Sequence, residues 1–139
     1  MNTLVADGTV RFVYRHMAFL GEESVQAAAA SECASEQGRF WDYHDVLFDH
    51  TAGRGRGVFT TPRLEQYAAD IGLDGVAFNT CVESGRYRDW VNGQTELGRQ
   101  QGVSSTPTLI VNGRLIPLQA SFDELRALLV ATADGPARE

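Results

Sequence analysis

Cysteine, positive charge and long apolar runs are all scarce in this sequence, and each scarcity excludes a class of protein. Only two of the 139 residues are cysteines, Cys33 and Cys81, and they stand far apart. Two cysteines are too few for a disulfide-rich scaffold, and their spacing does not suit a zinc site. No apolar run approaches the ~20 residues that a membrane-spanning helix needs. We therefore expect no membrane span and no zinc site.

Negative charge dominates the composition. The chain has 12 Lys and Arg against 18 Asp and Glu, a net charge of −6. Nucleic acid and anionic membrane surfaces both select a basic patch, so this balance argues against them as partners. Residues Met1–Asp7 have neither the basic start nor the apolar stretch of a secretion signal. The chain as given therefore reads as cytoplasmic.

Apolar residues at helical spacing fill the middle of the chain. Apolar stripes, helix-starting residues and helix-ending glycines predict five consecutive helices and one more near the end. The predicted ranges are 22–37, 40–50, 61–71, 75–84, 87–101 and a last helix that begins with the capping box Ser121–Glu124.

Strand patterns flank this helical stretch. Thr9–Arg15 alternates apolar and polar residues, which predicts a strand with at least one buried face. The apolar run Thr108–Val111, an Asn-Gly turn and Arg114–Leu118 predict a β-hairpin. With 43% hydrophobic residues, the chain is expected to form a single α/β domain over 1–139. Residues 22–101 would be a helical insertion within it.

Pro107 stands where the loop Gly102–Thr106 enters the first hairpin strand. Proline cannot donate a ladder hydrogen bond, so it belongs at the mouth of a strand. The Thr106–Pro107 bond is a plausible cis peptide, because trans is favoured by only about 0.5–1 kcal/mol before proline. A cis bond would leave the Thr106 backbone open to an extended peptide or to a sulfur atom. The alternative is an ordinary strand-initiating proline.

The histidines and the glycine-rich loop match no known pattern of a metal or phosphate site. His16, His44 and His50 lack the i,i+4 spacing of a metal-binding helix, so we expect hydrogen-bonded histidines, no metal and no cofactor. The glycines of the loop 51–60 do not match a phosphate-binding pattern. Arg54 and Arg56 in that loop are expected to be solvated, with an anion-contacting rim as the alternative.

The two cysteines have three interpretations from their positions alone. Cys33 and Cys81 both fall inside predicted helices and neither begins one. A thiol is activated when the positive end of a helix dipole lowers its pKa, and neither cysteine has that advantage. We therefore discount a redox pair and keep a structural disulfide or two reduced core thiols.

The order of several stretches resembles the DsbA-like group of thioredoxin-fold proteins. Gly102–Gly113 is similar to the cis-proline loop and following strand of that group. Val10–His16 resembles its second strand, and Glu32–Ala34 with Gln37–Phe48 resembles its inserted helical domain. The resemblance runs from about Gly8 to about Leu129 and implies a thioredoxin-like sheet with an inserted helical subdomain.

The match departs from that group at its reactive centre. In the group, a first strand and a helix with Cys-x-x-Cys perform thiol–disulfide exchange, whereas this sequence contains no Cys-x-x-Cys. The resemblance thus implies a fold whose first βα unit is missing and an oxidoreductase relative that is inactive as given, so whether the chain is an enzyme is left open. The alternatives are a non-catalytic peptide-binding or assembly module and, more weakly, a glutathione-linked transferase or isomerase relative.

The resemblance also assigns site residues. It implies that Ser105, Thr106, Pro107 and Thr108 hold the backbone of an extended peptide or of a protein thiol substrate. It implies a disulfide between Cys33 and Cys81, because some members of the group join two such helices in this way. A missing central strand would leave a sheet edge exposed, and we expect a homodimer through that edge.

Overall fold

The computed structural model describes residues 2–51, 57–116 and 121–133. The chain forms two compact units, which are treated separately below. The helical unit is Arg15–Gln101, and the hairpin unit is Met1–Tyr14 together with Gly102–Glu139. Arg54, Arg56 and the predicted strand end at Pro117 and Leu118 lie outside the described residues.

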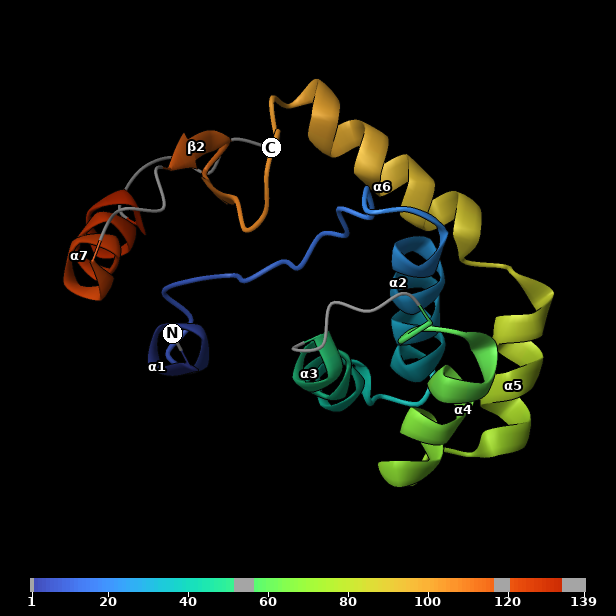
Figure 1. Cartoon of the computed structure of the whole chain (residues 1–139). Helices are drawn as coiled ribbons and strands as arrows, with labels where there is room; N and C mark the ends of the chain where they lie inside the picture. The colour runs from blue at the N-terminus through green and yellow to red at the C-terminus, as the bar shows by residue number, and fades with distance from the viewer. Residues whose placement is uncertain (1, 52–56, 117–120, 134–139) are drawn as a thin grey trace. The chain divides into compact units, whose positions relative to one another are not determined.

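The helical unit is built around α2 (Glu22–Ser35). This helix packs against α3 (Phe40–His50), α4 (Thr61–Asp70), α5 (Gly75–Ser84) and α6 (Arg88–Gln100) (Figure 1). Its buried positions include Ala27, Ala30 and Ala34, whose small side chains let neighbouring helices approach closely. The core around them contains Tyr43, Leu64, Tyr67, Phe78 and the two cysteines. All five predicted helices are present, with ends that shift by a residue or two.

Helix α5 shows how local sequence sets these boundaries. The Asp74 side chain accepts a hydrogen bond of 3.0 Å from the Ala77 backbone N–H, so Asp74 is the N-cap. Gly85 follows the last turn with φ of 65°, the left-handed conformation that glycine adopts without steric cost. These two residues bracket the ten-residue helix that carries Cys81.

The hairpin unit contains a two-stranded antiparallel sheet. Strands β1 (Leu109–Val111) and β2 (Arg114–Ile116) pair with Ile110 opposite Leu115. Asn112 and Gly113 both have positive φ, as a type I′ hairpin turn requires. Helix α7 (Phe122–Ala133) begins with the predicted capping box, in which Ser121 and Glu124 bond to each other. A small core joins this hairpin, α7 and the short helix α1 (Asn2–Ala6): Leu4, Val111 and Leu129.

The expected strand at Thr9–Arg15 is wrong. This stretch has no regular secondary structure, and helix α1 precedes it. An alternating sequence becomes a strand only when a second strand satisfies its backbone groups. In the described part of the chain, β1 and β2 pair with each other and with no third strand. Phe122, the first residue of α7, is exposed.

The chain belongs to the α/β class, although helices account for most of its described residues. A search of the described helices for length and apolar character found none able to cross a bilayer. The features that bear on function are therefore the core of the helical unit and the loop that enters β1.

Candidate functional site

The two cysteines are joined in the core of the helical unit. Cys33 on α2 and Cys81 on α5 form a disulfide with 5.8 Å between their Cα atoms. Their exposed fractions are 2% and 1%. Both lie in the last turns of their helices, where the negative end of the helix dipole disfavours a thiolate. The arrangement suits a stable link between helices and does not suit a reactive thiol.

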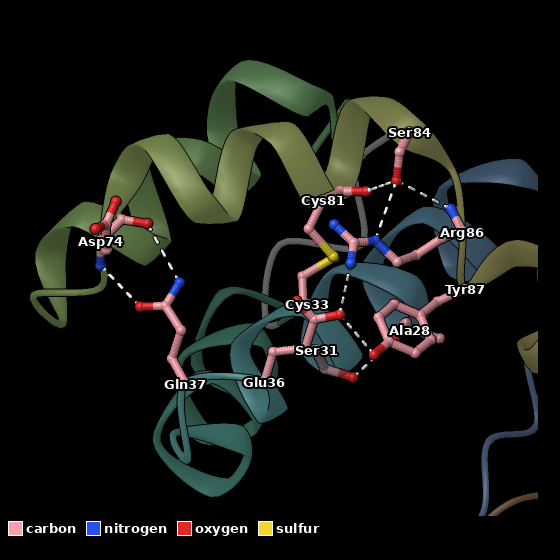
Figure 2. The surroundings of a disulfide bond; sticks show 10 residues. All are labelled: Ala28, Ser31, Cys33, Glu36, Gln37, Asp74, Cys81, Ser84, Arg86 and Tyr87. Carbon is pink, nitrogen blue, oxygen red and sulfur yellow. Dashed lines mark hydrogen bonds and ion pairs between the residues drawn. A yellow bond between two sulfur atoms is a disulfide. The ribbon is translucent and has the colours of Figure 1, made fainter.

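Polar contacts also join the residues just after α2 to the residues that flank α5, on either side of the disulfide (Figure 2). The Gln37 side chain donates to the Asp74 carbonyl over 3.2 Å and accepts from the Asp74 backbone N–H over 2.8 Å. On the other side, the Glu36 carboxylate accepts from the Tyr87 hydroxyl at 2.7 Å and from the Arg86 guanidinium at 3.1 Å. The hydrogen bond to Glu36 raises the pKa of Tyr87. The disulfide thus joins α2 to α5, and these polar contacts join the residues just after α2 to the residues that flank α5.

The predicted peptide-holding loop lies in the hairpin unit. Ser105, Thr106 and Pro107 are exposed, and Thr108 is half-buried. The Thr106–Pro107 peptide bond is cis. The Thr108 hydroxyl donates to the Ser105 carbonyl over 2.6 Å, which closes the loop on itself just before β1. The disulfide belongs to the helical unit and this loop to the hairpin unit.

A shallow hollow lies beside the disulfide within the helical unit. It has about 430 Å³ of space, part of which opens to solvent. Cys33 and Cys81 line it together with residues of α2 and α4, and Tyr87 and Arg88 line it at the start of α6. Sequence reasoning missed this hollow because its walls come from four separate helices.

His16 forms a buried polar junction that the sequence also did not reveal. It is 5% exposed, and its Nε2 lies 2.8 Å from a carboxylate oxygen of Glu32. Its backbone N–H donates to the Gln94 side chain at 2.9 Å, and the Ala18 N–H donates to the Thr95 hydroxyl at 2.9 Å. Burial lowers the pKa of His16 more than the Glu32 carboxylate raises it. The junction attaches the extended segment before α2 to both α2 and α6.

The other two histidines each form a hydrogen bond within α3. His44 bonds to the Asp45 carboxylate at 2.9 Å, and His50 bonds to the Val46 carbonyl at 2.8 Å. Residues 2–51, 57–116 and 121–133 contain no group of three His, Cys, Asp or Glu side chains placed to hold a metal ion. His44 also contacts the Trp41 ring edge-on and the tilted Phe48 ring on α3, with ring centroids 5.4 and 4.5 Å away.

Comparison with known proteins assigns the family. The chain belongs to the thioredoxin family, because the family model described as thioredoxin matches residues 1–131. The "Disulfide bond formation protein D" of Bacillus subtilis is 28% identical over 131 residues, which are 86% of this chain and 55% of that protein. This relation to a disulfide-forming protein and the thioredoxin match agree with the fold and the DsbA-like resemblance inferred from the sequence.

Part of the similarity is to proteins with a different name. A "Na(+)/H(+) antiporter NhaA 3" of Salinispora tropica is 33% identical over 113 residues, covering 80% of this chain and 17% of the antiporter. A "Na(+)/H(+) antiporter NhaA" of Herminiimonas arsenicoxydans is 32% identical over 128 residues, covering 91% and 19%. The chain therefore spans less than a fifth of these relatives and about half of the Bacillus protein.

Proposed function

We propose that this chain is a DsbA-like relative of thiol–disulfide oxidoreductases that performs no protein-disulfide exchange as given. The proposal rests on the state of the two cysteines. Both form one buried disulfide, and both lie in the C-terminal turns of their helices, where the helix dipole disfavours a thiolate. Protein-disulfide exchange requires a free thiolate that reaches a substrate disulfide, and neither Cys33 nor Cys81 is free.

The test is the reduction of insulin by dithiothreitol, followed by turbidity. The chain and its Cys33→Ser variant are each expected to match the uncatalysed rate. A thioredoxin with an intact Cys-x-x-Cys serves as the positive control. Activity of the chain above background that disappears in Cys33→Ser would show a working redox pair and overturn the proposal.

A second candidate function is peptide binding at the open edge of β1. Residues Ser105–Thr108 lead into this strand, which pairs with β2 alone in the described part of the sheet. Val111 and Arg114 flank a two-residue turn, so they form a hydrogen-bonded pair. The adjacent pair, Ile110 and Leu115, is therefore a non-hydrogen-bonded pair. The N–H and C=O of Ile110 therefore point away from β2, where an extended peptide would add as a strand.

Amide exchange measured by NMR tests this binding. An extended peptide is expected to slow exchange at Ile110 and to leave Val111, whose amide faces β2, unchanged. Titration with a peptide library that gives equal protection at both amides, or none, would refute binding at this edge.

The same edge supports a homodimer, in which β1 of two copies would pair. We expect the mass measured by sedimentation to rise with concentration, together with protection of Ile110 in the absence of peptide. A monomeric mass at millimolar concentration would exclude this dimer and would leave peptide binding in place.

A further inference from the structure

The hollow beside the disulfide is lined by both cysteines, by small and apolar residues, and by a few polar ones. Four elements form it: α2, α4, the end of α5 and the start of α6. Arg88 is the one charged side chain among the described residues that line it. The hollow is small and partly open to solvent, so only a small molecule could enter it.

Gly85 determines where the Arg88 side chain lies. A Cβ atom at position 85 would come within 3.2 Å of the Arg88 Cδ, and the φ of +65° at this residue favours glycine. The absence of a side chain at Gly85 therefore lets the aliphatic stem of Arg88 lie against the backbone at the edge of the hollow. The guanidinium pairs with the Glu22 carboxylate, and both side chains are exposed, at 40% and 60%. Such an exposed pair is weak and can be exchanged for another anion.

We propose that this hollow is a site where a small anionic thiol opens the Cys33–Cys81 disulfide. The thiolate sulfur attacks one cysteine sulfur, and a mixed disulfide forms as the Cys–Cys bond breaks. The other cysteine leaves as a thiolate and takes a proton from water. A second thiol can then release the first as a small disulfide, which leaves two protein thiols. The anionic group of the incoming thiol replaces Glu22 at Arg88.

Hydrogen bonds on both sides of the disulfide would hold the two helices together while the disulfide is open. Gln37 and Asp74 hold one side of the disulfide, and Glu36 with Tyr87 holds the other, without contribution from either sulfur (Figure 2). The exchange therefore belongs to the native chain. It goes beyond the proposed function, because it needs no Cys-x-x-Cys and no protein substrate.

The test compares three thiols with the same two-carbon skeleton: 2-mercaptoethanesulfonate, 2-mercaptoethanol and cysteamine. The native chain is treated with each, quenched with acid, alkylated and weighed by mass spectrometry. Rates are expressed per thiolate, so that the acidities of the three thiols do not enter. The anionic thiol is expected to open the disulfide about two- to fivefold faster than the neutral one, and the cationic thiol more slowly still.

Paired variants locate the effect at Arg88. Arg88→Gln is expected to abolish the advantage of the anionic thiol, and Glu22→Gln to increase it, because the arginine is then free. Arg99→Gln removes a charge from the same helix away from the hollow and should change nothing. Ala29→Leu narrows the hollow and should slow all three thiols, whereas Ala28→Leu on the same helix should not.

Two outcomes would overturn the proposal. Equal rates per thiolate for all three probes would show that no charged site guides the thiol. Rates that do not rise with thiol concentration would show that the bond opens only when the chain unfolds. Neither outcome affects the insulin experiment, so the two proposals fail independently.

Discussion

His16 brings an imidazole into the interior of the helical unit, where burial lowers its pKa. Its partners Glu32 and Gln94 stand 16 and 78 residues away in sequence, so no local pattern could have named them. From the sequence, only the position of His16 at the end of an apolar stretch could be recognised. The pairing exists because the chain crosses α2 and α6 at this point, and the uncharged form is the one that burial favours.

Lowering the pH should therefore destabilise the chain through His16. Its pKa is lowered in the folded state, so the unfolded state binds more protons below the ordinary value of 6.5. Stability is fully present above that pH and falls as the pH drops toward the folded pKa, by at most about 1.4 kcal/mol per pH unit for one proton. Urea unfolding at a series of pH values measures this slope.

The matched variants are His16→Gln and His50→Gln. The first should flatten the pH dependence of the free energy of unfolding just below neutrality, whereas the second should retain it. The groups that face His16 are Glu32, which favours its protonation, and His44, which opposes it. An unchanged slope in His16→Gln would assign the pH dependence to other groups.

At the scale of elements, the sequence predicted helices well and one strand badly. Helix α5 was predictable because Asp74 and Gly85 act within a few residues of the chain that they organise. The hairpin was predictable because Asn112 and Gly113 supply the conformation that the turn needs. Thr9–Arg15 failed because a strand depends on a partner, and an alternating pattern cannot tell whether that partner is present.

Removing the N-cap of α5 should have a measurable cost. Asp74→Ala loses the hydrogen bond to the Ala77 N–H and should lower the free energy of unfolding by about 0.5–2 kcal/mol. Asp70→Ala, which alters an exposed carboxylate that bonds only to Gln66 across one helical turn, should change it much less. Chemical denaturation with unchanged m-values would measure both, and equal effects would argue against capping.

The disulfide between α2 and α5 should contribute more than any cap. It spans 48 residues, which in the chain-entropy model stabilises the fold by about 4 kcal/mol. The double variant Cys33→Ala with Cys81→Ala should lose roughly that amount and still fold, because the polar ties on either side remain. Denaturation of the oxidised chain and of this variant gives the difference. A loss below about 1 kcal/mol would show that the chain-entropy model of this link does not apply here.

At the scale of the whole molecule, we infer that residues 1–139 fold as one domain with 22–101 as its helical insertion. The length of the chain and the order of its predicted strands and helices predict this organisation. The structure divides the chain into two compact units with a core in each. The sequence could not resolve the boundary at Tyr14 and Arg15, since no glycine, proline or change of composition marks it.

A single domain should unfold in one step. Both tryptophans, Trp41 and Trp90, lie in the helical unit, so their fluorescence follows that unit, while NMR signals of the Val111 and Leu129 methyl groups follow the hairpin unit. We expect the two urea transitions to share one midpoint, as two-state unfolding requires. Separate midpoints would show that the units are independent domains.

The position of the disulfide limits how far this chain can be stretched. Pulled from its two ends, the oxidised chain transmits force directly from Cys33 to Cys81, which are 48 positions apart, and leaves the segment between them slack. At about 3.6 Å per residue, roughly 170 Å of contour length is withheld from extension until the bond is cut. Three of the helices that pack on α2 have all or most of their length in that segment, so the disulfide shelters the centre of the helical unit from mechanical load.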